Sequence, residues 1–170
     1  MASKRSAGLL LFRRRGEQVE VLIAHMGGPF WARKDAGGWS IPKGEVEEGD
    51  EALATARREF EEELGSPPIK GELVDLGEVK QPSGKRIQVW ALEGDLDVDR
   101  IVSNTFELEW PPRSGEKQEF PEVDRAAWVS PAIAKTKLVK GQIPFIDLLA
   151  ERLGLPAEFK VADGDDAESR

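Results

Sequence analysis

Residues 51–64 predict the helix that most constrains what this chain can fold into. Asp50 is the expected N-cap, and Gly65, followed by a serine and two prolines, is the expected stop. At 100° per residue, one side of this helix collects the apolar side chains of Leu53, Ala56, Phe60 and Leu64. The rest of the fold must therefore supply a hydrophobic surface that covers this side.

Glutamates crowd the C-terminal half of the same helix, where the helix dipole disfavours negative charge by roughly 0.3–1 kcal/mol each. Arg57 and Arg58 can each pair with a glutamate four residues on, for only about 0.2–0.5 kcal/mol per pair. Within a roughly 100° arc lie three carboxylates, those of Glu59, Glu62 and Glu63. This arrangement suits Mg²⁺ or Mn²⁺, and the helix taken alone is equally compatible with a solvated acidic face.

The residues before the helix extend it into a longer pattern. The chain reads Trp39-Ser40-Ile41-Pro42-Lys43-Gly44-Glu45, then Gly49-Asp50, then Arg58-Glu59-Phe60-Glu61-Glu62-Glu63-Leu64-Gly65. It resembles the Nudix box, Gly-x5-Glu-x7-Arg-Glu-hydrophobic-x-Glu-Glu-x-Gly-hydrophobic, with every spacing kept. Asp50 stands in place of a Glu, which keeps the charge, and Ser66 in place of an apolar residue. So many fixed offsets make chance agreement improbable.

The resemblance implies an α/β (α+β) fold, in which a mixed β-sheet is sandwiched between α-helices over about residues 7–153. Strand-like runs fit it at 8–12, 19–24, 73–79 and 86–92, with a further pair expected at 106–110 and 126–129. Residues 25–38 predict a shaped loop and residues 39–42 a brief extended piece. Two short helices are expected from Ser130-Pro131 and from Pro144 to Arg152. We expect one domain over residues 1–155 and a solvated acidic tail over 156–170.

The resemblance also implies roles by position. It gives the metal ligands as Glu59, Glu62 and Glu63, with the carbonyl of Gly44 as a further contact, and the cofactor as Mg²⁺ or Mn²⁺. Arg58 is similar to the residue that holds the acidic cluster in place, and Lys43 to one that approaches a phosphate. The segment Trp-Ser-Ile-Pro-Lys-Gly is similar to the corresponding segment in the diadenosine tetraphosphate and diphosphoinositol hydrolase branches of the family.

Glu122 is a further candidate for metal binding or catalysis. It precedes Trp128 by six residues, an arrangement similar to the loop glutamate of diadenosine tetraphosphate hydrolases that supports a metal or activates water. The alternatives are an ordinary exposed glutamate in a turn-prone stretch, and Glu119 in the same role. The expected catalytic set is therefore Glu62, Glu63, Glu122 and Arg58.

The loop at 25–38 supplies the candidate substrate contacts. Arg33 and Lys34 can bind phosphate while Trp31 or Phe30 stacks on a base, or they are solvated charges beside a half-buried tryptophan. His25 can contact a phosphate or be a structural histidine. The chain has no Tyr, so base stacking elsewhere would fall to Trp90, Trp110 or Phe120.

Composition excludes several classes of function. The chain has no Cys and one His, which removes cysteine nucleophiles, thiolate zinc sites and sites built on several histidines. With 24 basic and 32 acidic residues the net charge is −8, which disfavours duplex nucleic acid as a partner. No stretch approaches the roughly 20 apolar residues of a membrane helix, so we expect no membrane partner and a cytoplasmic location. The sequence leaves the oligomeric state open.

These observations favour a metal-dependent hydrolase that cleaves a phosphoanhydride in a nucleoside diphosphate linked to another group. The expected substrate is a dinucleoside polyphosphate or a nucleoside triphosphate. ADP-ribose stays open because Pro82 is similar to a proline of ADP-ribose hydrolases, although a hairpin turn explains it better. Inositol pyrophosphates are disfavoured by the net charge of −8. A non-catalytic nucleotide sensor and a structural domain with an acidic helix are the other hypotheses.

Overall fold

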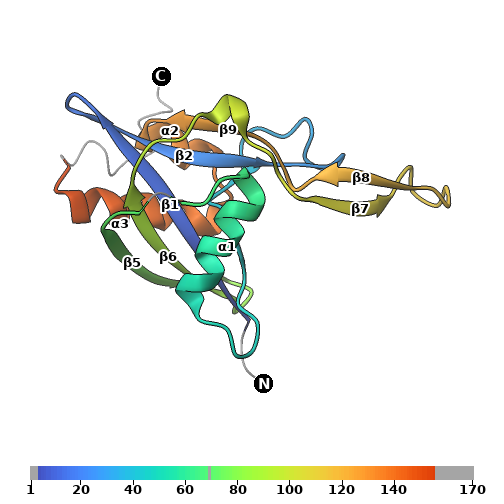
Figure 1. Cartoon of the computed structure of the whole chain (residues 1–170), viewed down its shortest axis with the longest axis horizontal. Coiled ribbons are helices and arrows are strands. Elements are labelled where there is room, and N and C mark those ends of the chain that lie inside the picture. The colour runs from blue at the N-terminus through green and yellow to red at the C-terminus, as the bar shows by residue number, and fades with distance from the viewer. Residues whose placement is uncertain (1–3, 69, 156–170) are drawn as a thin grey trace.

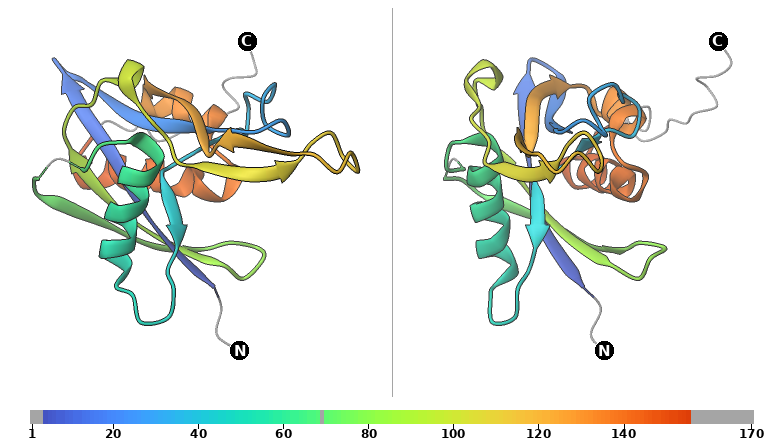
Figure 2. Two further views of the ribbon diagram at one scale, coloured as in Figure 1. Left: turned by 45° about the vertical axis from the view of Figure 1, so that its right-hand side comes forward. Right: turned by 90° about the vertical axis from the view of Figure 1, so that its right-hand side faces the viewer.

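The computed structural model describes residues 4–68 and 70–155. Its centre is a mixed β-sheet with helix α1 (Ala52–Leu64) on one face and helices α2 (Pro131–Lys137) and α3 (Ile143–Leu153) on the other (Figures 1 and 2). This arrangement confirms the predicted mixed sheet between helices. The expected acidic tail at 156–170 lies outside the described residues.

The sheet runs in the order β3-β2-β1-β6-β5. Strands β1 (Arg5–Arg15) and β2 (Gln18–Met26) are antiparallel, as are β5 (Leu73–Lys80) and β6 (Arg86–Glu93), whereas β1 and β6 are parallel. These four strands confirm the predicted runs and extend each of them. Two short strands join this sheet. Strand β3 (Trp39–Ser40) pairs with β2, and strand β4 (Lys43–Glu45) pairs with β1.

One predicted strand pair is wrong. Strand β7 (Thr105–Glu109) pairs with β8 (Lys117–Pro121) in a separate two-stranded sheet, and β9 (Val123–Val129) pairs with β2. The sequence did not show β8, because only one residue of its five, Phe120, is a large apolar residue. The β7–β8 hairpin extends away from the main sheet (Figure 1). Two short 3₁₀ helices, Val98–Arg100 and Lys140–Gln142, are the remaining elements of regular structure.

The central strands have two buried faces, which explains why they read as continuous apolar runs. In β1, Leu9 and Leu11 pack in the cluster that contains Phe60 and Leu64 of α1. The alternate residue Leu10 packs in the cluster beneath α2 and α3. Strand β1 therefore packs against the helices on both faces of the sheet, and its contacts with Phe60 and Leu64 position α1 on one of them.

Helix α1 begins one residue later than predicted. Its N-cap is Glu51, which makes no side-chain cap bond, and Asp50 instead points its carboxylate toward Arg58, at 3.8 Å. The stop at Gly65 is confirmed, since this glycine has φ 83° and its N–H donates to the carbonyl of Glu61. The buried side holds Ala56, Phe60 and Leu64 with Thr55, while Leu53 is only half-buried.

The two later helices follow the predicted signals. Ser130 caps α2 by accepting a hydrogen bond from the N–H of Ile133, and α3 ends at Gly154 in the left-handed conformation. The turn at residues 81–85, which contains Pro82, joins β5 to β6, so the hairpin-turn explanation for this proline is confirmed. Within the described residues, no helix is long and apolar enough to cross a membrane.

Candidate active site

The acidic end of α1 lies directly against β4. At Gly44 the backbone of β4 comes so close to the helix that an added Cβ would overlap the carboxyl group of Glu59. Only a glycine leaves room for that carboxylate, which is 17% exposed. The predicted pair Gly44 and Glu59 is thus in contact, with the carboxylate held between helix and sheet.

Burial and mutual repulsion raise the proton affinity of these carboxylates. Burial raises the pKa of Glu63 to about 8, and the charge of Glu59 adds to the increase. The pKa of Glu59 is also raised, first by burial and then by Glu62, against the opposing effect of Arg58. Carboxylates placed this way are stabilised as anions only by a nearby positive charge.

Arg58 lies among the acidic side chains and is half-exposed. Its guanidinium nitrogens are 3.7 Å from a carboxylate oxygen of Glu59, 3.7 Å from one of Glu62 and 3.8 Å from one of Asp50. No one of these distances is that of a tight bidentate pair, so Arg58 acts on three carboxylates at once. This is the placement that the resemblance implies for a residue that holds the cluster together.

A ladder of backbone hydrogen bonds brings Glu122 to the same end of α1. The N–H of Asn104 donates to the carbonyl of Glu62 at 2.8 Å, and the N–H of Glu122 donates to the carbonyl of Asn104 at 2.8 Å. Burial raises the pKa of Glu122, followed by the charge of Glu62. Glu119, by contrast, lies within β8 opposite Glu107. The structure thus places Glu122, and not its rival, beside the cluster.

The donor set fits a hard divalent cation. It consists of carboxylate oxygens and a nearby backbone carbonyl, the ligands that Mg²⁺ and Mn²⁺ prefer. Across residues 4–68 and 70–155, no three of these side chains form a ready-made metal-binding group, and Arg58 lies 3.7 Å from carboxylate oxygens of both Glu59 and Glu62. Four partly buried carboxylates, Glu59, Glu62, Glu63 and Glu122, nevertheless interact electrostatically, and a cation would relieve their repulsion.

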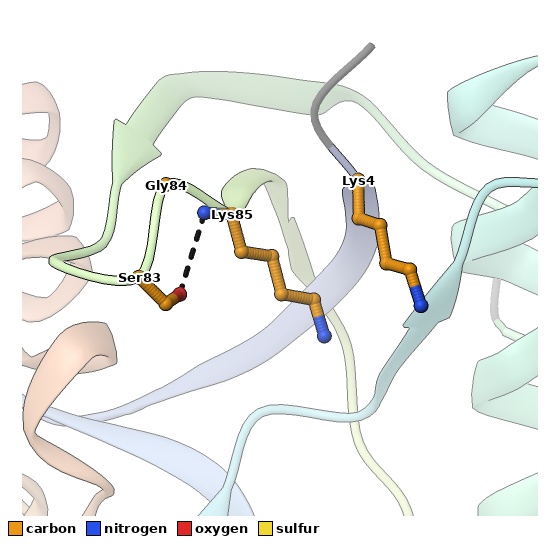
Figure 3. A pocket seen from close by; sticks show the side chains of 4 residues that line it. All are labelled: Lys4, Ser83, Gly84 and Lys85. Carbon is orange, nitrogen blue, oxygen red and sulfur yellow. Dashed lines mark hydrogen bonds between the residues drawn. The ribbon is translucent and has the colours of Figure 1, made fainter. Parts of the chain in front are cut away.

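Lys43 is the cation on the β4 side of the cluster. Burial lowers the pKa of its ammonium group, and Lys85 lowers it further, while Glu63 and Glu59 act in the opposite direction. Lys85 belongs to the β5–β6 turn and lines a hollow of about 300 Å³ together with Lys4, Ser83 and Gly84. Figure 3 shows the side chains of Lys4 and Lys85 extending in the same direction. A positive region thus adjoins the acidic one.

Sequence reasoning missed Lys4 and Lys85. Lys85 approaches Lys43, and Lys4 lies beside Lys85, because β1 pairs with both β4 and β6 and so brings three distant segments side by side. No local pattern contains that pairing. The same applies to Asn104, which lines a second hollow of about 460 Å³ with Arg58, Glu61, Glu62, Gly65 and Val102.

The loop cations lie elsewhere. Arg33 is exposed and makes no hydrogen bond or ion pair within the part of the chain that the structure describes. The ammonium of Lys34 lies 5.4 Å from the ring centroid of Trp31. Neither is among the groups that shift the pKa values of Glu59, Glu63 or Glu122. The loop that carries them is joined to the site at its first residue, where the N–H of Gly27 donates to the carbonyl of Glu122 at 2.9 Å.

His25 is structural in this fold, and the prediction that it contacts a phosphate is wrong. Its side chain is fully buried, and its ring nitrogens lie 2.8 Å from a carboxylate oxygen of Asp124 and 2.7 Å from the carbonyl oxygen of Lys34. Both partners accept hydrogen bonds, so both nitrogens are engaged. The imidazole anchors the loop at 27–38 to β9 and has no free nitrogen for a ligand.

Comparison with known proteins gives one family match. The model described as NUDIX domain matches residues 2–149. An 8-oxo-(d)GTP phosphatase from Mycolicibacterium smegmatis is 30% identical over 115 residues, which cover 58% of this chain and 34% of that protein. The chain thus matches about a third of the length of that relative.

Solved structures share the fold. A C. elegans Ap4A hydrolase in a binary complex is 19% identical with a TM-score of 0.59, covering 89% of this chain and 98% of that one. The NUDIX domain of Shewanella oneidensis NrtR, complexed with ADP ribose, is 20% identical with a TM-score of 0.60, covering 90% of each chain. At these identities the likeness concerns the fold.

We expect Gly44→Ala to weaken Mn²⁺ binding by about tenfold or more without unfolding the protein. The new methyl group must displace the flexible carboxylate of Glu59, which moves a ligand but leaves the core intact. Isothermal titration calorimetry measures the affinity. Gly71→Ala is the matched control, because its Cβ would meet nothing closer than 3.2 Å. Equal affinity in wild type and Gly44→Ala would contradict this role of the glycine.

We expect Glu63→Gln to stabilise the metal-free protein at alkaline pH. The pKa of Glu63 is raised from 4.5 to about 8 in the folded protein. The contribution of Glu63 to the free energy of unfolding is therefore fully present below pH 4.5 and is lost as the pH rises toward 8. Glutamine does not ionise and avoids that loss. In EDTA, the melting temperature of the variant should exceed that of the wild type by at least about 2 °C at pH 8, and by less at pH 5. The exposed Glu61→Gln is the control, and a difference independent of pH would contradict the burial of Glu63.

Proposed function

Because the chain belongs to the NUDIX domain family, we propose that it is a pyrophosphohydrolase of nucleoside diphosphate derivatives that uses Mg²⁺ or Mn²⁺ and prefers substrates with several phosphates. A dinucleoside polyphosphate and a nucleoside triphosphate are the two leading substrates. The proposal combines the acidic cluster on α1 with the positive region beside it.

One observation carries the proposal. Carboxylates whose pKa is raised by burial and mutual repulsion lie at one end of α1, beside a half-buried lysine of β4 whose pKa is lowered by burial. A merely solvated acidic face would keep its carboxylates exposed and apart. The combination suits a ligand that is itself a cation bound to a polyanion, as a metal–polyphosphate complex is.

The residues divide this work. Glu59, Glu62 and Glu63, with the carbonyl of Gly44 and with Glu122, would hold the cation, which when bound supplies Lewis acidity at a phosphoanhydride. Arg58 keeps the carboxylates of Glu59 and Glu62 oriented, from 3.7 Å. Glu122 is proposed to accept the proton of the attacking water on its carboxylate, a role that its raised pKa favours.

Lys43 is proposed to bind the phosphate next to the bond that is cleaved, and Lys85 and Lys4 the phosphates beyond it. Lys85 is close enough to lower the pKa of Lys43, after the larger effect of burial, and an anion bound between the two lysines would reduce their repulsion. A row of cations leading away from the acidic cluster favours a substrate with a longer phosphate chain over one with a single diphosphate. Arg33, Lys34 and Trp31 would act at the other border of the site.

The alternative substrates have weaker support. With Pro82 in the β5–β6 turn, the feature that favoured ADP-ribose is accounted for by the fold. An inositol pyrophosphate would need a denser ring of cations than the three lysines provide. A non-catalytic sensor would have no use for the complete set of carboxylates, and turnover with Mg²⁺ separates it from an enzyme.

We expect Glu122→Gln to slow hydrolysis by about 100-fold or more, because the attacking water loses its proton acceptor. Steady-state kinetics at saturating Mg²⁺ measure the change. Glu119→Gln, three residues away on β8, is the matched control and should retain wild-type turnover. A loss of only a few-fold in Glu122→Gln would return the role of general base to the glutamates of α1.

A substrate panel tests the preference directly. Diadenosine tetraphosphate, nucleoside triphosphates including 8-oxo-dGTP, ADP-ribose, NADH and an inositol pyrophosphate are assayed with Mg²⁺, and products are separated by ion exchange. We expect the substrates with three or more consecutive phosphates to lead in kcat/KM by about tenfold, a difference that one additional charge-assisted contact supplies. ADP-ribose ranking first would overturn the preference, and no turnover of any compound would favour the sensor.

A further inference from the structure

Gln142 is a buried polar residue that the proposed chemistry does not use. It ends the 3₁₀ helix Lys140–Gln142 and is the N-cap residue of α3, yet its side chain makes no capping hydrogen bond. The residue is fully buried. A buried amide is costly unless both its oxygen and its nitrogen find partners, so the partners of Gln142 show where this side chain acts.

Both ends of the amide bond to the segment that leads into β4. The side-chain oxygen of Gln142 accepts a hydrogen bond from the N–H of Ile41 at 2.7 Å, and its nitrogen donates to the hydroxyl of Ser40 at 3.0 Å. The same hydroxyl donates to the carbonyl of Ile41 at 2.8 Å. One side chain thus holds two consecutive residues of a distant segment.

The chain changes its strand partner in this segment. Strand β3 pairs with β2 and ends at Ser40, whereas β4 pairs with β1 and begins at Lys43. Ile41 lies between the two strands, and its hydrogen bond to Gln142 is buried. Because a buried backbone N–H needs an acceptor, the amide of Gln142 takes the place of a strand partner at this crossover.

The crossover leads directly into the site. Ile41 is separated only by Pro42 from Lys43, and Gly44 follows. The ring of Pro42 restricts its φ, and its carbonyl accepts a hydrogen bond from the N–H of Leu9 at 3.1 Å. With so little freedom between them, the backbone direction that is set at Ile41 is carried on into β4.

The same 3₁₀ helix contacts the segment that bears the second lysine. A Cβ at Gly141 would overlap the side-chain amide of Gln81, so the two residues pack directly together. Gln81 begins the β5–β6 turn and donates its N–H to the carbonyl of Lys85 at 2.8 Å. One short helix therefore contacts both segments that carry the proposed phosphate-binding lysines.

We propose that Gln142 is a positioning residue for the candidate active site, whose amide sets where the backbone of Lys43 and Gly44 lies relative to the acidic cluster. The contact between Gly44 and Glu59 leaves no room for β4 to move closer to α1, so a small displacement there moves a ligand. Residues that orient metal ligands from behind typically change metal affinity by about 10- to 100-fold when they are replaced. The inference rests on the proposed function, which supplies the cation and the phosphates.

Gln142→Met tests this role, because the unbranched methionine fills irregular core space and makes neither hydrogen bond. Isothermal titration calorimetry measures the affinity for Mn²⁺, and amide hydrogen exchange in EDTA measures the local stability of β4. We expect Mn²⁺ to bind about tenfold more weakly and the amides of residues 41–45 to exchange faster than in the wild type.

Leu149→Ala is the matched control. It leaves a cavity beside α3 in the core that also contains Ile41, and it removes no hydrogen bond to residues 40–41. It should lower the melting temperature and leave the Mn²⁺ affinity unchanged. If Gln142→Met does not fold, Ser40→Ala removes one partner of the same amide, and unchanged Mn²⁺ affinity in that variant would overturn the inference.

The outcomes separate this inference from the proposed function. If Gln142→Met weakens Mn²⁺ binding but the wild type hydrolyses no member of the substrate panel, the positioning role holds and the enzymatic proposal fails. If the wild type hydrolyses a substrate and Gln142→Met retains both the Mn²⁺ affinity and KM, the enzyme holds and the positioning role is wrong. A lower melting temperature as the only change would likewise make Gln142 a purely structural residue.

Discussion

The contact between Gly44 and Glu59 is the constraint on which the rest of the site depends. It requires a strand residue without a side chain, and it places a carboxylate between helix and sheet, where water can solvate it only in part. Once Phe60 and Leu64 pack α1 against the sheet, the neighbouring Glu63 is half-buried as well, and burial raises its pKa. The hydrophobic packing of the helix thus forces the like charges together, and electrostatics alone would separate them.

Backbone hydrogen bonds then attach the other parts of the site to the same helix end. Asn104 bonds to Glu62, Glu122 to Asn104, and Gly27 to Glu122, so three segments far apart in the sequence are fixed in series. Backbone donors and acceptors have little freedom once paired, which positions these segments more firmly than side-chain contacts would. The buried His25 gives the loop at 27–38 a second anchor through Asp124 and the carbonyl of Lys34.

The sequence predicted best the features that local chemistry determines. The helix at 52–64 with its stop at Gly65, the four main strands and the caps of the later helices all have local signals, and each is confirmed. The spacing within the helix also indicated which glutamates share a side. The prediction of Asp50 as N-cap was wrong, since Glu51 is the N-cap and the carboxylate of Asp50 lies 3.8 Å from the guanidinium of Arg58.

Features that depend on strand pairing could not be predicted in this way. The partner of β7 was wrong because β8 has almost no apolar pattern, and its pairing depends on a hairpin rather than on a core. The approach of Lys85 to Lys43 follows from the parallel pairing of β1 with β6 across some 80 residues of sequence. For His25 the residue type allowed two roles, and only the identities of its two hydrogen-bond partners separate them.

The proposed site combines carboxylates at one end of α1 with lysines on β4 and in the β5–β6 turn beside it. Around α1, the charges are partly buried, so ionic interactions are strengthened by surroundings of lower dielectric than water, and a misplaced group is costly. A cation held by the carboxylates would offset part of their charge, which would allow a chain with a net charge of −8 to hold a polyanion. The phosphates need only meet the few lysines that the fold brings beside β4.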